Sequence, residues 1–455
     1  MDASRRRPGT ADSSGGFRKG NYSAEEAMSL SLKILHLVGM WPAGKSAAYQ
    51  LYTVVMCSSY PLFYLMMAWF FLAGGKTTTM YLEQAGVVLA FVPVTFNVVT
   101  VLLKRRRLRE VVDRLRSFAE RTRCAGVLRD AVKQERRVVL LVSVACLLGG
   151  SSMLVEPVGT YYTVPDDSNT TAGLSLVLEI YPEGQLGGLA FAAMFAFQGL
   201  VFLGLFVTFV PVEVFLSVLV LHAAGQFEAL VILVRNSGCL DRRWPSGTGE
   251  GHTPGQSQTR RGHPAGSKDD LLQLTSEMPE TRPHKKKPAS STGMCSDPAE
   301  SRDMARVWQN IVACHQEALR NATELCELLR MVLFLYYALT SVVICMILYQ
   351  FNAAESVFAK VYNCFYLTAV LLRLFIMSFL STRLSKKSEQ ISDEVAATEW
   401  YEYNNGVKVT LVIMMSRAQR PVQMWAGRFA VMSLETFSAI LNAAYSYFNV
   451  LNRVT

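Results

Sequence analysis

PVQMWAGRFAVMSLETFSAILNAAYSYFNVLNRVT, residues Pro421 to Thr455, is the stretch that decides the fold of this chain. Its part from Phe429 to Asn452 is apolar enough to cross a bilayer. Polar side chains recur in it every three or four residues, at Glu435, Ser438, Asn442, Ser446 and Asn449, and Arg453 follows just beyond it at the same spacing. On a helix these positions form one stripe. Because an ionisable group that faces lipid costs several kcal/mol, the stripe indicates either a polar contact between helices or the wall of an aqueous path.

The composition of the whole chain is that of a polytopic membrane protein. Of its 455 residues 51% are hydrophobic and 18% are charged, and the mean hydropathy of +0.23 is too high for a soluble globular protein of this size. The net charge is +9. The basic residues lie in loops between apolar segments, which favours a role in membrane topology over binding of nucleic acid.

Seven apolar segments are long enough to span a bilayer as helices. They are Ala47–Leu72, Gln84–Leu103, Val138–Val155, Leu189–Leu221, Met331–Phe351, Val361–Thr382 and Phe429–Asn452. The loop from Lys104 to Arg137 carries thirteen Lys or Arg against five acidic residues, so we expect it in the cytosol. Counting spans from this loop places the N-terminus in the cytosol and the C-terminus outside. The loop after the third span lacks Lys and Arg and holds a glycosylation sequon at Asn169, as an extracellular loop can.

Composition divides the chain into five parts, which we expect to differ in structure. They are a cytosolic N-terminus with an interfacial amphipathic helix at 1–46, spans one to four at 47–235, a disordered cytosolic insertion at 236–302, cytosolic helices with spans five and six at 303–420, and the last span at 421–455. Pro421 lacks a backbone donor, which predicts a seventh helix split into a cytosolic and a membrane segment. Arg373 lies toward the cytosolic half of the sixth span, and we expect its side chain to snorkel toward the cytosolic interface.

Two adjoining stretches resemble the insect odorant receptors. One is ETFSAILNAAYSYFNVL, and the other runs from Ser388 to Phe429, with Trp400-Tyr401, Met-Met-x-Arg-Ala-Gln-x-Pro and Ala426-Gly427. His222, followed four residues later by Gln-Phe, fits the same resemblance. It implies an all-α bundle of seven transmembrane helices that works as an odour-gated, non-selective cation channel. It also implies an odour-tuning subunit that forms a heterotetramer with a co-receptor in the plasma membrane of olfactory sensory neurons.

Other functions fit the sequence less well. We find no nucleophile, dinucleotide-binding or metalloprotease motif, and therefore expect no enzyme and no metal or other cofactor. A G-protein-coupled receptor would place its N-terminus outside, against the charge pattern. Gustatory receptors share the architecture but end the last helix with Thr-Tyr, an apolar run and Gln-Phe, where this chain has AYSYFNVLN. Both receptor classes remain as alternatives, as do a channel formed by this chain alone and a co-receptor role.

The resemblance also implies which residues act. The last helix would line the pore with Asn442, Ser446 and Asn449, and apolar rings of Val450 and Val454 would form the gate; plain packing against lipid is the alternative for both valines. A ring of Arg453 would disfavour cations, so few copies of this subunit enter each pore or Arg453 points away from its axis. Odorants would bind in the outer half of helices two, three, four and six. The candidate ligand-binding residues at this depth in the membrane are Phe91, Ser151, Met194, Phe197, Tyr362, Phe365 and Tyr366.

Overall fold

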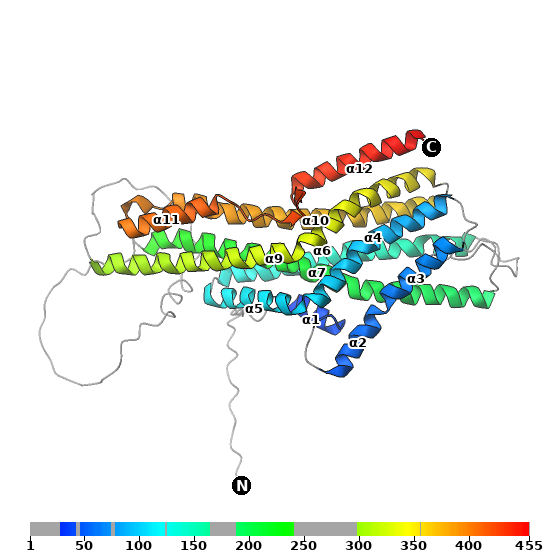
Figure 1. Cartoon of the computed structure of the whole chain (residues 1–455), viewed down its shortest axis with the longest axis horizontal. Helices are drawn as coiled ribbons and strands as arrows, with labels where there is room; N and C mark the ends of the chain where they lie inside the picture. The colour runs from blue at the N-terminus through cyan, green and yellow to red at the C-terminus, as the bar shows by residue number, and fades with distance from the viewer. Residues whose placement is uncertain are drawn as a thin grey trace, which may run out of the picture.

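The computed structural model describes residues 28–41, 46–73, 78–122, 125–163, 188–240, 298–354 and 356–454. These residues form an elongated bundle of α-helices with a short β-hairpin (Figure 1). In chain order the elements are α1 (Ser29–Leu37), α2 (Ala47–Cys57), α3 (Ser59–Leu72), α4 (Thr78–Leu103), α5 (Arg105–Thr122), α6 (Ala125–Thr163), α7 (Gly188–Leu240), α9 (Pro298–Ala353), α10 (Val357–Ala396), the 3-10 helix η2 (Trp400–Glu402), α11 (Asn405–Ala418), β1 (Trp425–Ala426), β2 (Ala430–Val431) and α12 (Leu434–Val454).

Several helices are long and apolar enough to cross a membrane. Within the described residues, five candidate spans meet this criterion by length and composition: Ala47–Leu72, Met80–Leu103, Leu189–Ser237, Met304–Ala353 and Val357–Ala396. They contain the first, second, fourth, fifth and sixth spans that the sequence predicts. The third predicted span lies in α6, and the seventh coincides with α12 only from Leu434 on. Some side chains of both helices fall outside the described residues.

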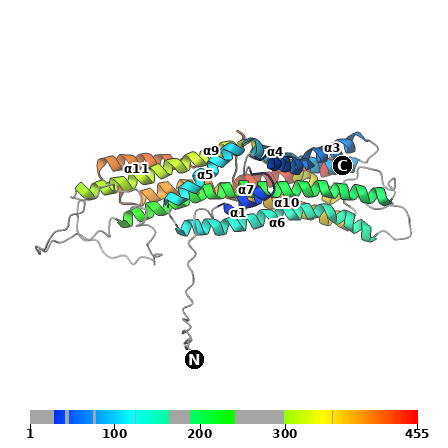
Figure 2. The ribbon, with the colours of Figure 1, turned by 90° about the horizontal axis from the view of Figure 1, so that it is seen from below.

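Helix α7 forms the centre of the bundle. It is 53 residues long, which corresponds to about 80 Å, and all its residues from 211 to 224 are buried. It packs against α6, α9, α10 and α4 along its length (Figure 2). The sequence predicts a fourth helix that outruns a bilayer, and α7 extends still further, to Leu240. Burial along α7 is not uniform, since Leu200 and Leu203, nearer its start, are 68% and 59% exposed.

The first predicted span is broken into α2 and α3 at Ser58. Pro61 lacks an amide hydrogen, and its ring would collide with the carbonyl of Cys57 in a continuous helix. The Ser58 amide instead donates to the Val55 carbonyl at 3.2 Å, as in a 3-10 turn. Only α3 buries side chains: Phe63 and Phe70 are fully buried, whereas α2 has no buried residue.

A hairpin separates α11 from α12. Trp425 pairs with Val431, and Gly427 at the turn has a φ of +62°, which L-residues rarely adopt. The Gly427 amide donates to the carbonyl of Arg330 on α9 at 3.0 Å. A Cβ at this glycine would lie 3.1 Å from the Phe334 ring. The hairpin is thus held tightly against α9.

The last helix therefore begins later than the apolar pattern predicts. The predicted interruption at Pro421 is present, since α11 ends at Ala418, but the chain becomes helical again only at Leu434. The Leu434 amide donates to the Thr382 hydroxyl on α10 at 3.0 Å, and the Ser433 hydroxyl accepts from the Thr436 amide at 3.1 Å. These bonds cap the new helix and explain its starting point.

Candidate functional site

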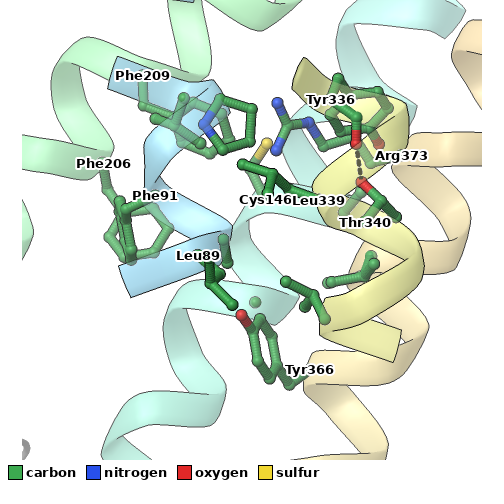
Figure 3. Close-up of a pocket in the computed structure, with 18 residues that line it drawn as sticks. Leu89, Phe91, Cys146, Phe206, Phe209, Tyr336, Leu339, Thr340, Tyr366 and Arg373 are labelled. Atoms are coloured by element: carbon green, nitrogen blue, oxygen red, sulfur yellow. Dashed lines mark hydrogen bonds between the residues drawn. The ribbon is translucent and has the colours of Figure 1, made fainter. Parts of the chain in front are cut away.

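A cavity lies between five helices, α4, α6, α7, α9 and α10. Its volume is about 90 Å³, and most of its lining is aliphatic or aromatic (Figure 3). The lining residues are Leu89, Ala90, Phe91, Pro93, Val94, Ala145, Cys146, Gly149, Phe206, Phe209, Tyr336, Leu339, Thr340, Val343, Tyr366, Ala369, Val370 and Arg373. A concave, largely apolar space with few polar groups is the common form of a site for a small organic molecule.

The cavity exists because aromatic side chains hold the helices apart on one side while small residues let them approach on the other. Phe91 of α4 packs against Phe63, Phe202 and Phe206, with ring centroids 4.9, 6.2 and 6.4 Å away. On the opposite side, a Cβ added at Gly149 of α6 would lie 3.2 Å from the Ala369 methyl of α10. The sequence therefore shapes the cavity through side-chain size at the helix contacts.

A buried ion pair closes one end of the cavity. The Arg373 guanidinium of α10 donates to both carboxylate oxygens of Glu213 on α7, at 2.6 and 3.2 Å. Their side chains are 17% and 8% exposed, and the amide nitrogen of Asn97 also donates to Glu213. The guanidinium lies 4.5 Å from the Tyr336 ring centroid and 5.0 Å from that of Phe209. These contacts stabilise a charge that would otherwise be costly to bury.

This pair corrects the expectation that Arg373 snorkels toward the cytosolic interface. Its guanidinium points inward, to Glu213, and lines the cavity (Figure 3). Snorkelling would be favoured only if the bundle offered no partner for the charge, and α7 supplies one. Glu213 was not among the predicted site residues. The signal that could have found it is a lone acid in the apolar fourth span, opposite in charge to the lone base of the sixth.

The predicted ligand-binding residues fall in different places. Phe91 and Tyr366 line the cavity. Tyr362 stacks on Tyr366, with centroids 5.9 Å apart, but does not line the cavity. Phe197 and Phe365 are 43% and 41% exposed and lie on the outside of the single chain. Two further residues complete the prediction: Met194, which is half-buried away from the cavity, and Ser151, whose side chain lies outside the described residues.

The structure adds lining residues that the sequence reasoning did not consider. Tyr336, Leu339, Thr340 and Val343 all come from α9, the fifth predicted span. The sequence predicts ligand contacts only in the second, third, fourth and sixth spans. An aromatic pair in the fifth span, Tyr336-Tyr337, was the available signal, since a buried tyrosine needs a partner for its hydroxyl.

The polar stripe of α12 faces away from the rest of the chain. Asn442 and Ser446 are exposed and Asn449 is half-buried, whereas Ala444 is only 1% exposed. On the packed side, Phe437 contacts Phe375 of α10 with centroids 5.8 Å apart. The helix lies at the edge of the bundle against α9 and α10 (Figure 1). In a single chain most of the stripe is therefore exposed, as it would be if it faced an aqueous path or a second copy.

The predicted gate residues lie at the far end of the same helix. Val450 is 62% exposed. The side chains of Arg453 and Val454 lie outside the described residues, as does the sequon at Asn169. Within the described residues, no group of three or more His, Cys, Asp or Glu side chains is placed to hold a metal ion.

Comparison with known proteins identifies the relatives of this chain. The family profile described as 7tm Odorant receptor matches residues 77–445. Odorant receptor 10 of Aedes albopictus is 26% identical over 144 residues, which is 32% of this chain and 38% of that protein. Odorant receptor 9a of Drosophila melanogaster is 30% identical over 141 residues, 31% of this chain and 36% of that protein. The matched stretches thus span little more than a third of each relative.

The fold has solved counterparts. The insect olfactory receptor OR5 from Machilis hrabei, in complex with eugenol, superimposes with a TM-score of 0.66 and 12% identity, covering 95% of this chain and 100% of that one. A second structure of the same receptor gives a TM-score of 0.65 and 14% identity, covering 94% of this chain and 98% of that one. At such identity the likeness establishes the seven-transmembrane fold alone. Since the family profile covers most of the sequence, this chain belongs to the insect odorant receptor family.

Proposed function

We propose that this chain is the odour-tuning subunit of an odour-gated, non-selective cation channel, and that it assembles with a co-receptor subunit as a heterotetramer in the plasma membrane of olfactory sensory neurons. The observation that carries the proposal is the polar stripe of α12, which is exposed on the single chain although the helix is otherwise apolar. A stripe of this kind is stable in a bilayer only against water or polar partners. Around a shared axis it would line a pore.

The cavity supports the odorant-binding part of the proposal. It is small and mostly apolar, which suits small volatile molecules. The Machilis receptor that shares the fold was solved in complex with eugenol. We propose that Phe91 and Tyr366, which line the cavity, contact the ligand. The aromatic residues outside it, such as Phe197 and Phe365, would act through packing.

The gate and the stoichiometry follow from the end of α12. Rings of Val450 and Val454 would close the pore by excluding water, and a small outward displacement would admit hydrated cations. Four copies of Arg453 around one axis would repel cations. This supports a channel in which the co-receptor supplies most of the pore, and it predicts little cation current from this chain alone.

The topology belongs to the same proposal. The basic loop that contains α5 would lie in the cytosol, and with it the N-terminus, whereas the sequon at Asn169 and the C-terminus would lie outside. This orientation is opposite to that of a G-protein-coupled receptor. Antibody access to epitope tags at the two ends of the chain in intact cells tests it directly.

The decisive experiment is expression of the chain with and without the co-receptor, followed by recording of currents against a panel of odorants. We expect odorant-evoked cation currents only in the co-expressing cells, and we expect them to persist when G-protein signalling is blocked. Currents that vanish with the G-protein block would favour the receptor alternative. Absence of current in every combination would refute the channel.

A further inference from the structure

The cavity wall contains two hydroxyl groups that lack hydrogen-bond partners. Tyr336 of α9 and Tyr366 of α10 are 6% and 8% exposed, both line the cavity, and neither hydroxyl has a partner among the described residues. Figure 3 shows the two residues at opposite ends of the lining. Buried hydroxyls are nearly always paired, so two unpaired ones on residues that line one apolar space indicate that a bound molecule supplies the missing partner.

The other polar groups of the lining are already engaged. The Thr340 hydroxyl donates to the Tyr336 carbonyl, and the Arg373 guanidinium donates to both oxygens of Glu213. Cys146 offers only a weak donor. Because Glu213 neutralises Arg373, the described part of the cavity wall presents hydroxyl donors but no uncompensated charge.

The surroundings of Tyr336 favour donation over acceptance. The Arg373 guanidinium lies over its ring at 4.5 Å from the centroid. A cation in this position withdraws electron density from the phenol, which makes its hydroxyl a better donor and a poorer acceptor. The partner that fits Tyr336 is therefore an oxygen with a free lone pair.

We propose that the cavity selects neutral molecules that carry an acceptor oxygen, such as a ketone, ester or ether, on a small apolar skeleton, and that Tyr336 and Tyr366 are the residues that determine this specificity. This rests on the proposed function only in taking the cavity as the ligand site. A hydrocarbon of the same shape would leave both hydroxyls unpaired. A carboxylate would bring a charge into the cavity without a counter-charge.

Isosteric ligands test the inference on the purified full-length chain in lipid nanodiscs. Acetophenone and isopropenylbenzene differ only in C=O against C=CH₂, as do cyclohexanone and methylenecyclohexane, and benzoate is the charged analogue. Affinity is measured from the ligand-induced rise in unfolding temperature. The variants are Tyr336→Phe, Tyr366→Phe and their combination. Tyr362→Phe is the matched control, since Tyr362 stacks on Tyr366 but does not line the cavity.

We expect each ketone to bind more tightly than its hydrocarbon partner and benzoate to bind most weakly. The double substitution should lower ketone affinity by roughly fivefold, the value of one neutral hydrogen bond, and leave hydrocarbon affinity unchanged or improved. Each single substitution should lower ketone affinity by less, because one carbonyl oxygen pairs with only one of the two hydroxyls at a time. Tyr362→Phe should keep the full preference. Because the same ligand is compared across variants, its partition into lipid cancels from the difference in affinity.

Three results would overturn the inference: equal binding of ketones and hydrocarbons, a ketone preference that survives in the double variant, or no binding of either pair. Odorant-evoked current without any ketone preference would refute the inference and leave the proposed channel intact. Ketone-selective binding by a chain that yields no current with the co-receptor would refute the proposed channel and leave the inference intact.

Discussion

Burial of the Arg373 guanidinium depends on a single carboxylate. Replacing Glu213 by Gln would leave the positive charge in the bundle with only aromatic faces and neutral dipoles around it. Removing one partner of a buried pair typically costs about 3–5 kcal/mol. We expect Glu213→Gln to lower the thermal unfolding midpoint of the purified protein clearly. The double replacement Glu213→Leu with Arg373→Met should recover most of the loss, because no charge then remains buried.

The matched control for this prediction is the exposed pair Arg106–Glu110 on α5, whose nitrogen and oxygen lie 3.6 Å apart and whose side chains are 94% and 56% exposed. Glu110→Gln should cost less than about 0.5 kcal/mol. An unfolding midpoint that moves equally in Glu213→Gln and Glu110→Gln would contradict a stabilising role of the buried pair.

Single residues were the hardest level to predict from the sequence, for a geometric reason. Hydropathy gives the depth of a residue in the bilayer but not its direction around the helix axis. Depth in the bilayer predicts both Phe91 and Phe197 as ligand contacts. Phe91 lines the cavity, whereas Phe197 is 43% exposed on the outside. Glu213 and Arg373 are 160 positions apart, so their contact depends on how α7 and α10 pack.

Helix α1 is held in place by one buried carboxylate. Glu135 of α6, only 1% exposed, accepts from the Met28 amide at 3.0 Å and from the Ser31 amide and hydroxyl at 3.4 and 3.3 Å. Its carboxylate also contacts the His222 ring at 3.2 Å. Burial alone would raise the pKa of Glu135, but these hydrogen bonds and the charge interaction with His222 outweigh it and hold the pKa below its usual value. The ionised carboxylate thus binds the first turn of α1, where the helix dipole favours a negative charge.

A pH dependence follows from this lowered pKa. Since the folded pKa is below the unfolded one, the stabilisation is complete above the ordinary pKa of about 4.3 and is lost as the pH falls through the folded value. Glu135→Gln should remove this dependence and weaken the docking of α1 by about 1.5–3 kcal/mol at neutral pH. Hydrogen exchange of the amides in α1 measures the docking. The docking model is wrong if these amides exchange equally in Glu135→Gln and in the exposed control Glu110→Gln.

The hairpin between α11 and α12 gives a prediction about backbone conformation. Gly427→Ala would require an L-residue at a φ of +62° with its Cβ 3.1 Å from the Phe334 ring. We expect a loss of about 1–3 kcal/mol in the free energy of unfolding, read as a lower unfolding midpoint. The control is Gly225→Ala in α7, where an added Cβ meets nothing within 4 Å and alanine should stabilise the helix by up to about 1 kcal/mol.

Equal destabilisation by these two alanines would show that the turn does not need its glycine.

The elements themselves were largely predictable, because long apolar runs and Pro421 mark where helices lie and where one is interrupted. The hairpin was not, since its strands are two residues each and its turn depends on a contact with Arg330, about a hundred positions earlier. The break at Ser58 was marked by Pro61 but lay inside a continuous apolar run.

For the whole molecule, the decisive question is whether α12 lines a pore in the assembled channel. Ser446 lies on the polar stripe and Tyr447, 63% exposed, points to a different side of the same helix. If the stripe faces the pore, a cysteine at 446 is reached by water, while a cysteine at 447 faces lipid or a neighbouring helix. The assay is co-expression with the co-receptor and application of a water-soluble thiol reagent during odorant stimulation.

We expect Ser446→Cys channels to lose current irreversibly once opened, because the bound reagent obstructs the pore, and to react much more slowly in the absence of odorant. Tyr447→Cys channels and the unsubstituted chain, which has its own exposed thiol at Cys364, should keep their current. Modification of Tyr447→Cys but not of Ser446→Cys would show that the polar stripe of α12 does not face the conduction path. The polar residues of α12 would then be explained as contacts between helices, and the gate would have to be sought elsewhere.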